Sequence, residues 1–114
     1  MALSKEFVLA WRTWQLMTPS FDVARANRTQ GSTFAAEHDL DHLTGYVRFL
    51  GHALIDGKEN DYARLAGQEL RALDGIRALL DQCAGDDERA GRLRAFVDAT
   101  ESVLKAVVNQ DTKP

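Results

Sequence analysis

Three histidines occur along one stretch of this chain, at positions 38, 42 and 52. His38 and His42 are one helical turn apart, so both imidazoles could bind one zinc or iron ion. Four nearby or facing carboxylates could complete such a site: Glu37, Asp39, Asp41 and Glu69. Carboxylate-bridged metal bundles, however, use a Glu-x-x-His pair on each of two helices, and this chain has only the fragment Asp39-x-x-His42. A metal-binding bundle that uses His38 and His42 is therefore an alternative, while the main prediction includes no metal and no cofactor.

The third histidine opens the segment His52-Ala53-Leu54-Ile55-Asp56-Gly57-Lys58. This segment looks similar to the motif of histidine phosphotransfer domains, which are helical bundles of about this size. The resemblance implies that His52 would carry the phosphoryl group. The segment departs from the family pattern because Ile55 replaces a lysine and the glycine comes one place late. Asp56 would also repel a phosphoryl group. Phosphotransfer through His52 is the second alternative.

Other catalytic patterns are absent from the sequence. There is no Gly-x-Ser-x-Gly motif and no glycine-rich phosphate loop, and the eight glycines are dispersed. The single cysteine, Cys83, has no neighbouring residues that would activate a thiolate nucleophile. We therefore predict that the protein is not an enzyme.

The stretch from Ala36 to Asp56 carries two sets of residues with helical spacing. The first set is apolar and repeats like the buried stripe of a helix: Ala36, Leu40, Leu43, Val47, Leu50 and Leu54. The second set repeats at the same steps and, at about 100° per residue, lies roughly opposite the first: His38, His42, Gly45, Phe49, His52 and Asp56. A surface helix normally carries charged residues on that side. Imidazoles, a glycine and a phenylalanine there instead predict a contact surface.

Gly45 lies in the middle of this second set. Glycine inside a helix costs about 1 kcal/mol relative to alanine, and its missing side chain would let another helix approach closely. We predict that this side of the helix is an interface with a partner or with a second copy. Two copies that cross antiparallel at Gly45 would bring His42 near Phe49, and His38 near His52, of the other chain.

The N-terminal segment is predicted to be a helix over about residues 4–17. Ser4 is a suitable N-cap, and Thr18-Pro19 is expected to end the helix because the residue before a proline is disfavoured in the α region. Apolar residues surround most of this helix, including Trp11 and Trp14. Tryptophan is a frequent anchor at protein interfaces, so both are included in the predicted interface, with burial inside the bundle as the open alternative.

Three further helices are expected, at about 34–56, 61–83 and 87–108, and a short helix over 21–28 is left open. Gly57 is expected to end the helix 34–56 in a left-handed conformation. Glu69 interrupts the apolar stripe of the helix 61–83, and we expect its carboxylate at the edge of the stripe, in water. No stretch alternates with a period of two, so no strand is predicted. The prediction is an all-α, up-and-down four-helix bundle, a single domain over residues 1–114 that forms a dimer.

The amino-acid composition of the chain argues against some classes of function. The chain has 114 residues, 45% of them hydrophobic, and a net charge of −3 with its basic residues spread out, which argues against nucleic-acid binding. It has no apolar run of about 18 residues, so no membrane span is predicted. One cysteine fits a reducing cytoplasm. We expect a cytoplasmic, non-enzymatic regulatory protein that binds another protein of unknown identity, as an inhibitor, antiactivator or adaptor; a transcription regulator is one candidate target.

Overall fold

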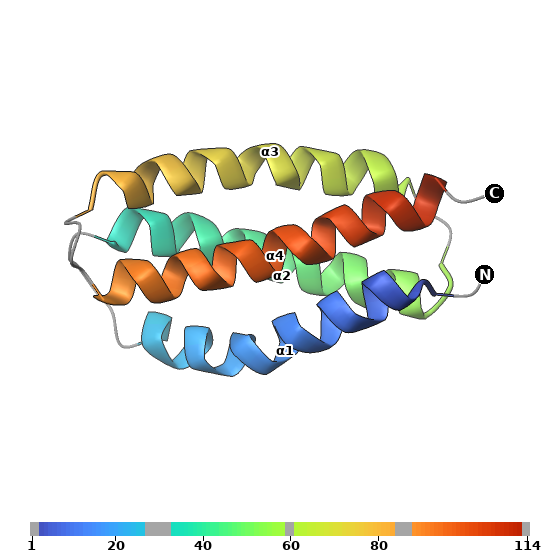
Figure 1. The fold of residues 1–114 in the computed structure, drawn as a ribbon, viewed down its shortest axis with the longest axis horizontal. Helices are drawn as coiled ribbons and strands as arrows, with labels where there is room; N and C mark the ends of the chain where they lie inside the picture. The colour runs from blue at the N-terminus through green and yellow to red at the C-terminus, as the bar shows by residue number, and fades with distance from the viewer. Residues whose placement is uncertain (1–2, 27–32, 59–60, 84–87, 113–114) are drawn as a thin grey trace.

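The computed structural model describes residues 3–26, 33–58, 61–83 and 88–112. These residues form four α-helices, in chain order α1 (Lys5–Ala26), α2 (Phe34–Ile55), α3 (Tyr62–Asp81) and α4 (Glu88–Thr112). Successive helices run in opposite directions (Figure 1). The described ranges contain no strand, and none of their helices has a segment long and apolar enough to span a membrane. The predicted all-α, up-and-down arrangement of four helices is confirmed.

The helix α4 is the central element of the bundle. It packs against each of the other three helices, while α1 and α3 lie on opposite sides of the molecule and do not meet (Figure 1). The contact between α1 and α2 is the least extensive of the helix pairs. The side of α2 that faces away from α4 is therefore flanked by α1 on one edge and α3 on the other, with no further described helix over it.

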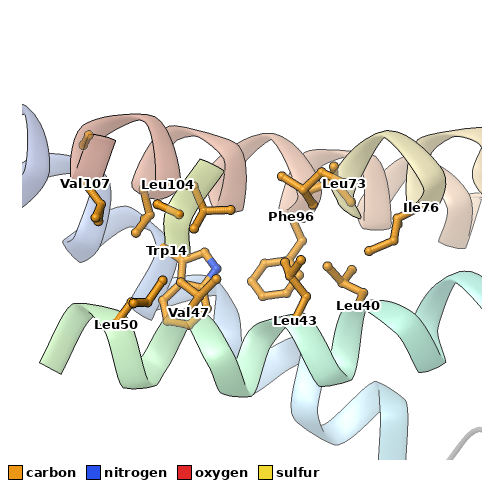
Figure 2. Close-up of a cluster of buried hydrophobic side chains, with 14 of the residues drawn as sticks. Trp14, Leu40, Leu43, Val47, Leu50, Leu73, Ile76, Phe96, Leu104 and Val107 are labelled. Carbon is orange, nitrogen blue, oxygen red and sulfur yellow. The ribbon is translucent and has the colours of Figure 1, made fainter. Parts of the chain in front are cut away.

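The apolar stripe of α2 is buried as its spacing predicts. All six members lie in the core: Ala36, Leu40, Leu43, Val47, Leu50 and Leu54. They face Trp14 of α1, Leu73 and Ile76 of α3, and residues of α4 that include Phe96, Leu104 and Val107 (Figure 2). Burial of such side chains is the main favourable term in folding, about 25 cal/mol for each Å² of apolar surface.

The first helix is longer than predicted. Ser4 caps it as expected, since its hydroxyl accepts a hydrogen bond from the N–H of Phe7 at 3.1 Å. The predicted end at Thr18-Pro19, however, is wrong, because α1 continues through Pro19 to Ala26. A proline inside a helix leaves the carbonyl four residues earlier without its usual donor. Here that carbonyl belongs to Gln15, and the hydroxyl of Thr18 donates to it at 3.0 Å.

Because α1 continues to Ala26, the possible short helix over 21–28 is not a separate element. Residues 21–26 are the last part of α1, and residues 27 and 28 lie outside the described ranges. The buried ring of Phe21 holds this last part of α1 on the bundle, because it stacks on Phe96 of α4 with ring centres 4.8 Å apart.

The end of α2 follows the prediction. Gly57 has a φ of +71°, the left-handed conformation that glycine adopts without strain. The N–H of Gly57 donates to the carbonyl of Leu54 at 3.1 Å, and the N–H of Lys58 donates to that of Ala53 at 3.0 Å. These two bonds form a Schellman motif, which satisfies carbonyls that the end of the helix leaves open.

The remaining helix boundaries lie close to the predicted ones, except for the C-terminal end of α4. α3 begins and ends within two residues of the predicted 61–83, and residue 87 lies outside the described ranges. α4 extends to Thr112, beyond the predicted end at residue 108. The extension is held by α1, because Gln110 accepts a hydrogen bond from the N–H of Ser4 at 2.6 Å and Asn109 donates to Glu6 at 3.2 Å.

Candidate functional site

The second set of residues on α2 lies on the surface of the bundle. We call it the outer face of α2: His38, His42, Gly45, Phe49, His52 and Asp56, all exposed. Its most unusual member is Phe49, which is 54% exposed, whereas most other aromatic residues of the described chain lie in the core. The opposite orientation of the two sets on α2 is as the spacing predicts; a partner on the outer face stays a prediction.

Aromatic and imidazole rings contact one another along this face. The ring of Phe34 stacks on His38 at 6.4 Å, and His38 meets His42 edge to face at 5.1 Å, both between ring centres. One turn further on, Tyr46 lies against Phe49 at 6.1 Å. These contacts limit the freedom of the side chains, so that a partner would meet a partly ordered surface.

The backbone is accessible in the middle of the outer face. A Cβ atom built on Gly45 would have no heavy atom from elsewhere in the molecule within 4 Å. The space over Gly45 is therefore not used by the fold itself. Contact of a partner at Gly45 stays a prediction.

A groove of about 520 Å³ runs beside the outer face, between α2 and α3. Its apolar lining includes Leu43 and Ile76, and its α3 side has the small residues Ala72 and Gly75. Two carboxylates, an imidazole and a phenol also line the groove: Asp39, Glu69, His42 and Tyr46. The groove thus continues the outer face toward α3 with a surface that is apolar at its base and mainly acidic at its edges.

Glu69 is half-buried, so its carboxylate is less hydrated than the predicted position in water at the edge of the α3 stripe. Burial raises the pKa of Glu69 above its ordinary value of 4.5. Within the described part of the chain, its carboxylate makes no hydrogen bond or ion pair that would offset this desolvation.

The histidines do not form a metal-binding cluster in the described ranges. Among those residues, no three His, Cys, Asp or Glu side chains lie close enough together to hold one ion. His38 and His42 contact each other edge to face, and Asp39 and Glu69 line the groove beside His42 without completing a ligand set. The arrangement offers imidazoles for hydrogen bonds and ring contacts.

His52 has a different neighbour from the other two histidines. Its ring meets the indole of Trp11 edge to face, with ring centres 5.4 Å apart. Ile55 and Asp56, about one helical turn after His52, are also exposed. The surface beside His52 therefore has an apolar and an acidic side chain. A phosphoryl group on His52 would gain no cation from either of them.

The two predicted tryptophan anchors require a correction. Trp14 is 1% exposed and Trp11 is 6% exposed, so both belong to the core and neither presents its ring to a partner. The indole N–H of Trp14 donates to the hydroxyl of Thr100 at 2.9 Å inside the bundle. The helix α1 packs against both α4 and α2, which accounts for the burial of its aromatic residues, while Leu9 and Leu16 remain exposed.

Sequence reasoning missed the surroundings of one residue, Glu37. It is completely buried, accepts a hydrogen bond from Thr33 at 2.6 Å, and forms an ion pair with Arg89 of α4. In the sequence, Glu37 is recognisable only as a carboxylate near His38 and His42 and as an acidic residue at the start of a helix, where the helix dipole favours it. The signal for the ion pair was weak, because Arg89 is one of several arginines in α4 and lies far away in the sequence.

We find no protein family model, curated protein or solved structure that matches this chain.

Proposed function

We propose that this chain is a small non-enzymatic regulatory protein that acts by binding another protein through the outer face of α2. An inhibitor, antiactivator or adaptor would work in this way, and a transcription regulator is one candidate target. The free thiol of Cys83 is compatible with a reducing compartment such as the cytoplasm. A second copy of the chain is the first partner to test, because two-fold self-association is the commonest form of assembly.

The observation that carries the proposal is the exposed ring of Phe49 beside the open backbone of Gly45. A phenylalanine buries about 150–250 Å² when it is covered, so leaving it in water forfeits a large favourable term. Aromatic side chains, phenylalanine included, are enriched in the cores of protein interfaces. Phe49 is also held by Tyr46, which lowers the entropy that binding would remove.

The helix geometry favours a helix as the partner element. Gly45 lies in the middle of the outer face, and nothing in the molecule occupies the space over it. A second glycine, Gly75, lines the groove on the α3 side and is equally open. Small residues at a crossing point let two helix backbones come close together. A partner helix could thus cross α2 at Gly45 and lie partly in the groove between α2 and α3.

The charge of the site favours a partner with basic residues near its apolar anchor. Asp39 and Glu69 line the groove, and Asp56 lies at the end of the outer face. Opposite charges at the rim of an interface mainly increase the rate of association and select among partners. For a symmetric dimer, Arg48 on the same helix is a nearby cation, although it pairs with Asp22 in the monomer at 2.6 Å.

The experiment compares Gly45→Ala with Gly67→Ala in sedimentation velocity and in thermal unfolding. Both glycines are open and lie inside helices, so each substitution should raise the free energy of unfolding by up to about 1 kcal/mol. Only Gly45→Ala fills the proposed crossing point, so it alone should weaken association. Phe49→Asp should weaken association further and leave the helix content unchanged.

If self-association is absent at high micromolar concentration, the same three variants are compared in a pull-down from native lysate. A partner that is lost with Phe49→Asp and Gly45→Ala but retained with Gly67→Ala supports the proposal. If all three variants retain the same partners as the unchanged chain, the binding surface lies elsewhere and the assignment of the outer face is overturned.

A further inference from the structure

A second site lies on the other side of the bundle, between the last part of α1 and the first part of α4. It is a pocket of about 340 Å³. Its apolar lining includes Met17, Phe21, Leu93 and Phe96, and most of its surface is apolar. It shares no residue with the outer face of α2. Its volume is at the lower end of the range for small-molecule sites, which is about 300–1,000 Å³.

The polar lining residues of this pocket come from three helices: Ser20 of α1, Glu37 of α2, and Arg89 and Arg92 of α4. The carboxylate of Glu37 is buried and is already balanced by Arg89, whose Nε lies 3.1 Å from one carboxylate oxygen. Arg92 is mostly exposed and lies 3.5 Å from Glu88, a distant contact between two exposed side chains that contributes little. The lining thus has one carboxylate and two guanidinium groups, and Arg92 is the cation that a ligand can reach, in competition with the exposed carboxylate of Glu88.

An exposed leucine extends the apolar surface at the entrance. Leu16 is 82% exposed, the largest fraction among the exposed large hydrophobic side chains of the described residues. It belongs to the lining of the pocket. An apolar interior, an apolar edge and an accessible guanidinium group together match a ligand that has a hydrocarbon or aromatic body and one anionic group.

We propose that this pocket binds a small anionic amphiphile, such as a medium-chain carboxylate. The hydrocarbon body lies against Phe21, Leu93 and Phe96, and the carboxylate lies at the rim beside Arg92. Guanidinium groups bind carboxylates through paired, charge-assisted hydrogen bonds, which makes arginine well suited to this position. The ion pair of Glu37 and Arg89 also belongs to the lining of the pocket.

Trp14 gives the site a built-in optical signal. Its indole stacks on Phe96 with ring centres 6.1 Å apart, and Phe96 lines the pocket. The test titrates the full chain with three probes that have the same hydrocarbon chain: octanoate, octanol and octylammonium. Tryptophan fluorescence gives the affinity, and amide chemical shifts of isotope-labelled protein locate the probe.

The expected order of affinity is octanoate, then octanol, then octylammonium, with the largest shifts at Leu16, Leu93 and Phe96. Arg92→Glu should weaken octanoate binding about fivefold and leave octanol binding nearly unchanged. Arg71→Glu makes the same charge change on the exposed surface of α3 and should have no effect. Ala95→Phe adds a ring at the pocket lining without a charge change and should weaken all three probes.

Three results would overturn the proposal. They are an absence of binding at millimolar probe, equal affinity for octanoate and octanol, and chemical shifts that are spread over the surface or centred on α2. Equal affinity would mean that the pocket takes a neutral apolar group, such as a side chain of a partner. Circular dichroism of each variant shows whether a loss of binding comes from a loss of the fold.

Discussion

The indole of Trp11 lies directly on the backbone of α2 at Gly51. A Cβ atom at this glycine would be 2.0 Å from one carbon of the Trp11 ring and 2.2 Å from another. The ring cannot easily move aside, because it is stacked against Phe7 at 5.8 Å and against Trp14 at 5.3 Å. This contact is where α1 and α2 approach each other, so Gly51 determines how closely the two helices pack.

Gly51→Ala is therefore expected to destabilise the fold. Overpacking a filled core costs about 1–3 kcal/mol, which should exceed the gain of about 1 kcal/mol from the higher helix propensity of alanine. Urea unfolding followed by circular dichroism measures the difference. Gly67→Ala has the same chemistry at an open position and should be neutral or stabilising. Equal effects of the two substitutions would show that the indole does not lie on Gly51.

The Thr18 hydroxyl is expected to compensate for Pro19. Thr18→Val keeps the shape of the side chain but removes the donor to the carbonyl of Gln15, so it should lower the free energy of unfolding by about 1 kcal/mol. In the background of Pro19→Ala, the backbone N–H at position 19 can donate to the same carbonyl. The cost of Thr18→Val should then be smaller. A double-mutant cycle with additive effects would contradict the compensation.

Much of the fold is predictable because its determinants are local. The stripe from Ala36 to Leu54 identifies the buried side of α2, and Gly57 identifies its end, since both patterns depend on residues close together in the sequence. Pro19 misleads for the same reason. The rule for the residue before a proline describes the backbone alone, and it takes no account of the Thr18 side chain that replaces the missing donor or of Phe21, which holds the following turn on α4.

The candidate sites are predictable only in part. The outer face of α2 follows from spacing, because the side opposite a buried stripe is exposed in a helix that has neighbours on only three sides. The burial of Trp11 could not be predicted in this way, because its partner is a glycine on another helix. The pocket beside Arg92 is also beyond sequence analysis, since its residues come from three helices and only packing brings them together.

The buried pair of Glu37 and Arg89 is expected to respond strongly to the loss of one member. Glu37→Met removes the carboxylate that accepts hydrogen bonds from the Arg89 guanidinium, and breaking a buried pair costs about 3–5 kcal/mol. The Arg89 side chain is 27% exposed and can reach water, so a value of about 2–3 kcal/mol is expected. Adding Arg89→Met should recover most of the loss. If the double variant is as unstable as Glu37→Met alone, the packing of the two side chains, and not their charges, determines the loss of stability.

Glu69 gives the fold a dependence on pH with a defined sign. Because burial raises the pKa of Glu69 above 4.5, the folded protein holds this proton more tightly than the unfolded chain does. The contribution of Glu69 to stability is therefore most favourable below the unfolded pKa and is lost as the pH rises through the folded pKa. Glu69→Gln removes the ionisation and should raise the melting temperature at pH 7.

The difference between Glu69→Gln and the unchanged chain should shrink and disappear as the pH falls below about 4, where both side chains are neutral. Thermal unfolding at pH 7 and at pH 3.5, with the same salt, measures it. The groove between α2 and α3 makes the same experiment informative about binding, because a cationic partner group beside Glu69 would stabilise the carboxylate and reverse the sign at pH 7. An equal difference at both pH values would contradict a half-buried carboxylate without an ion-pair partner at this position.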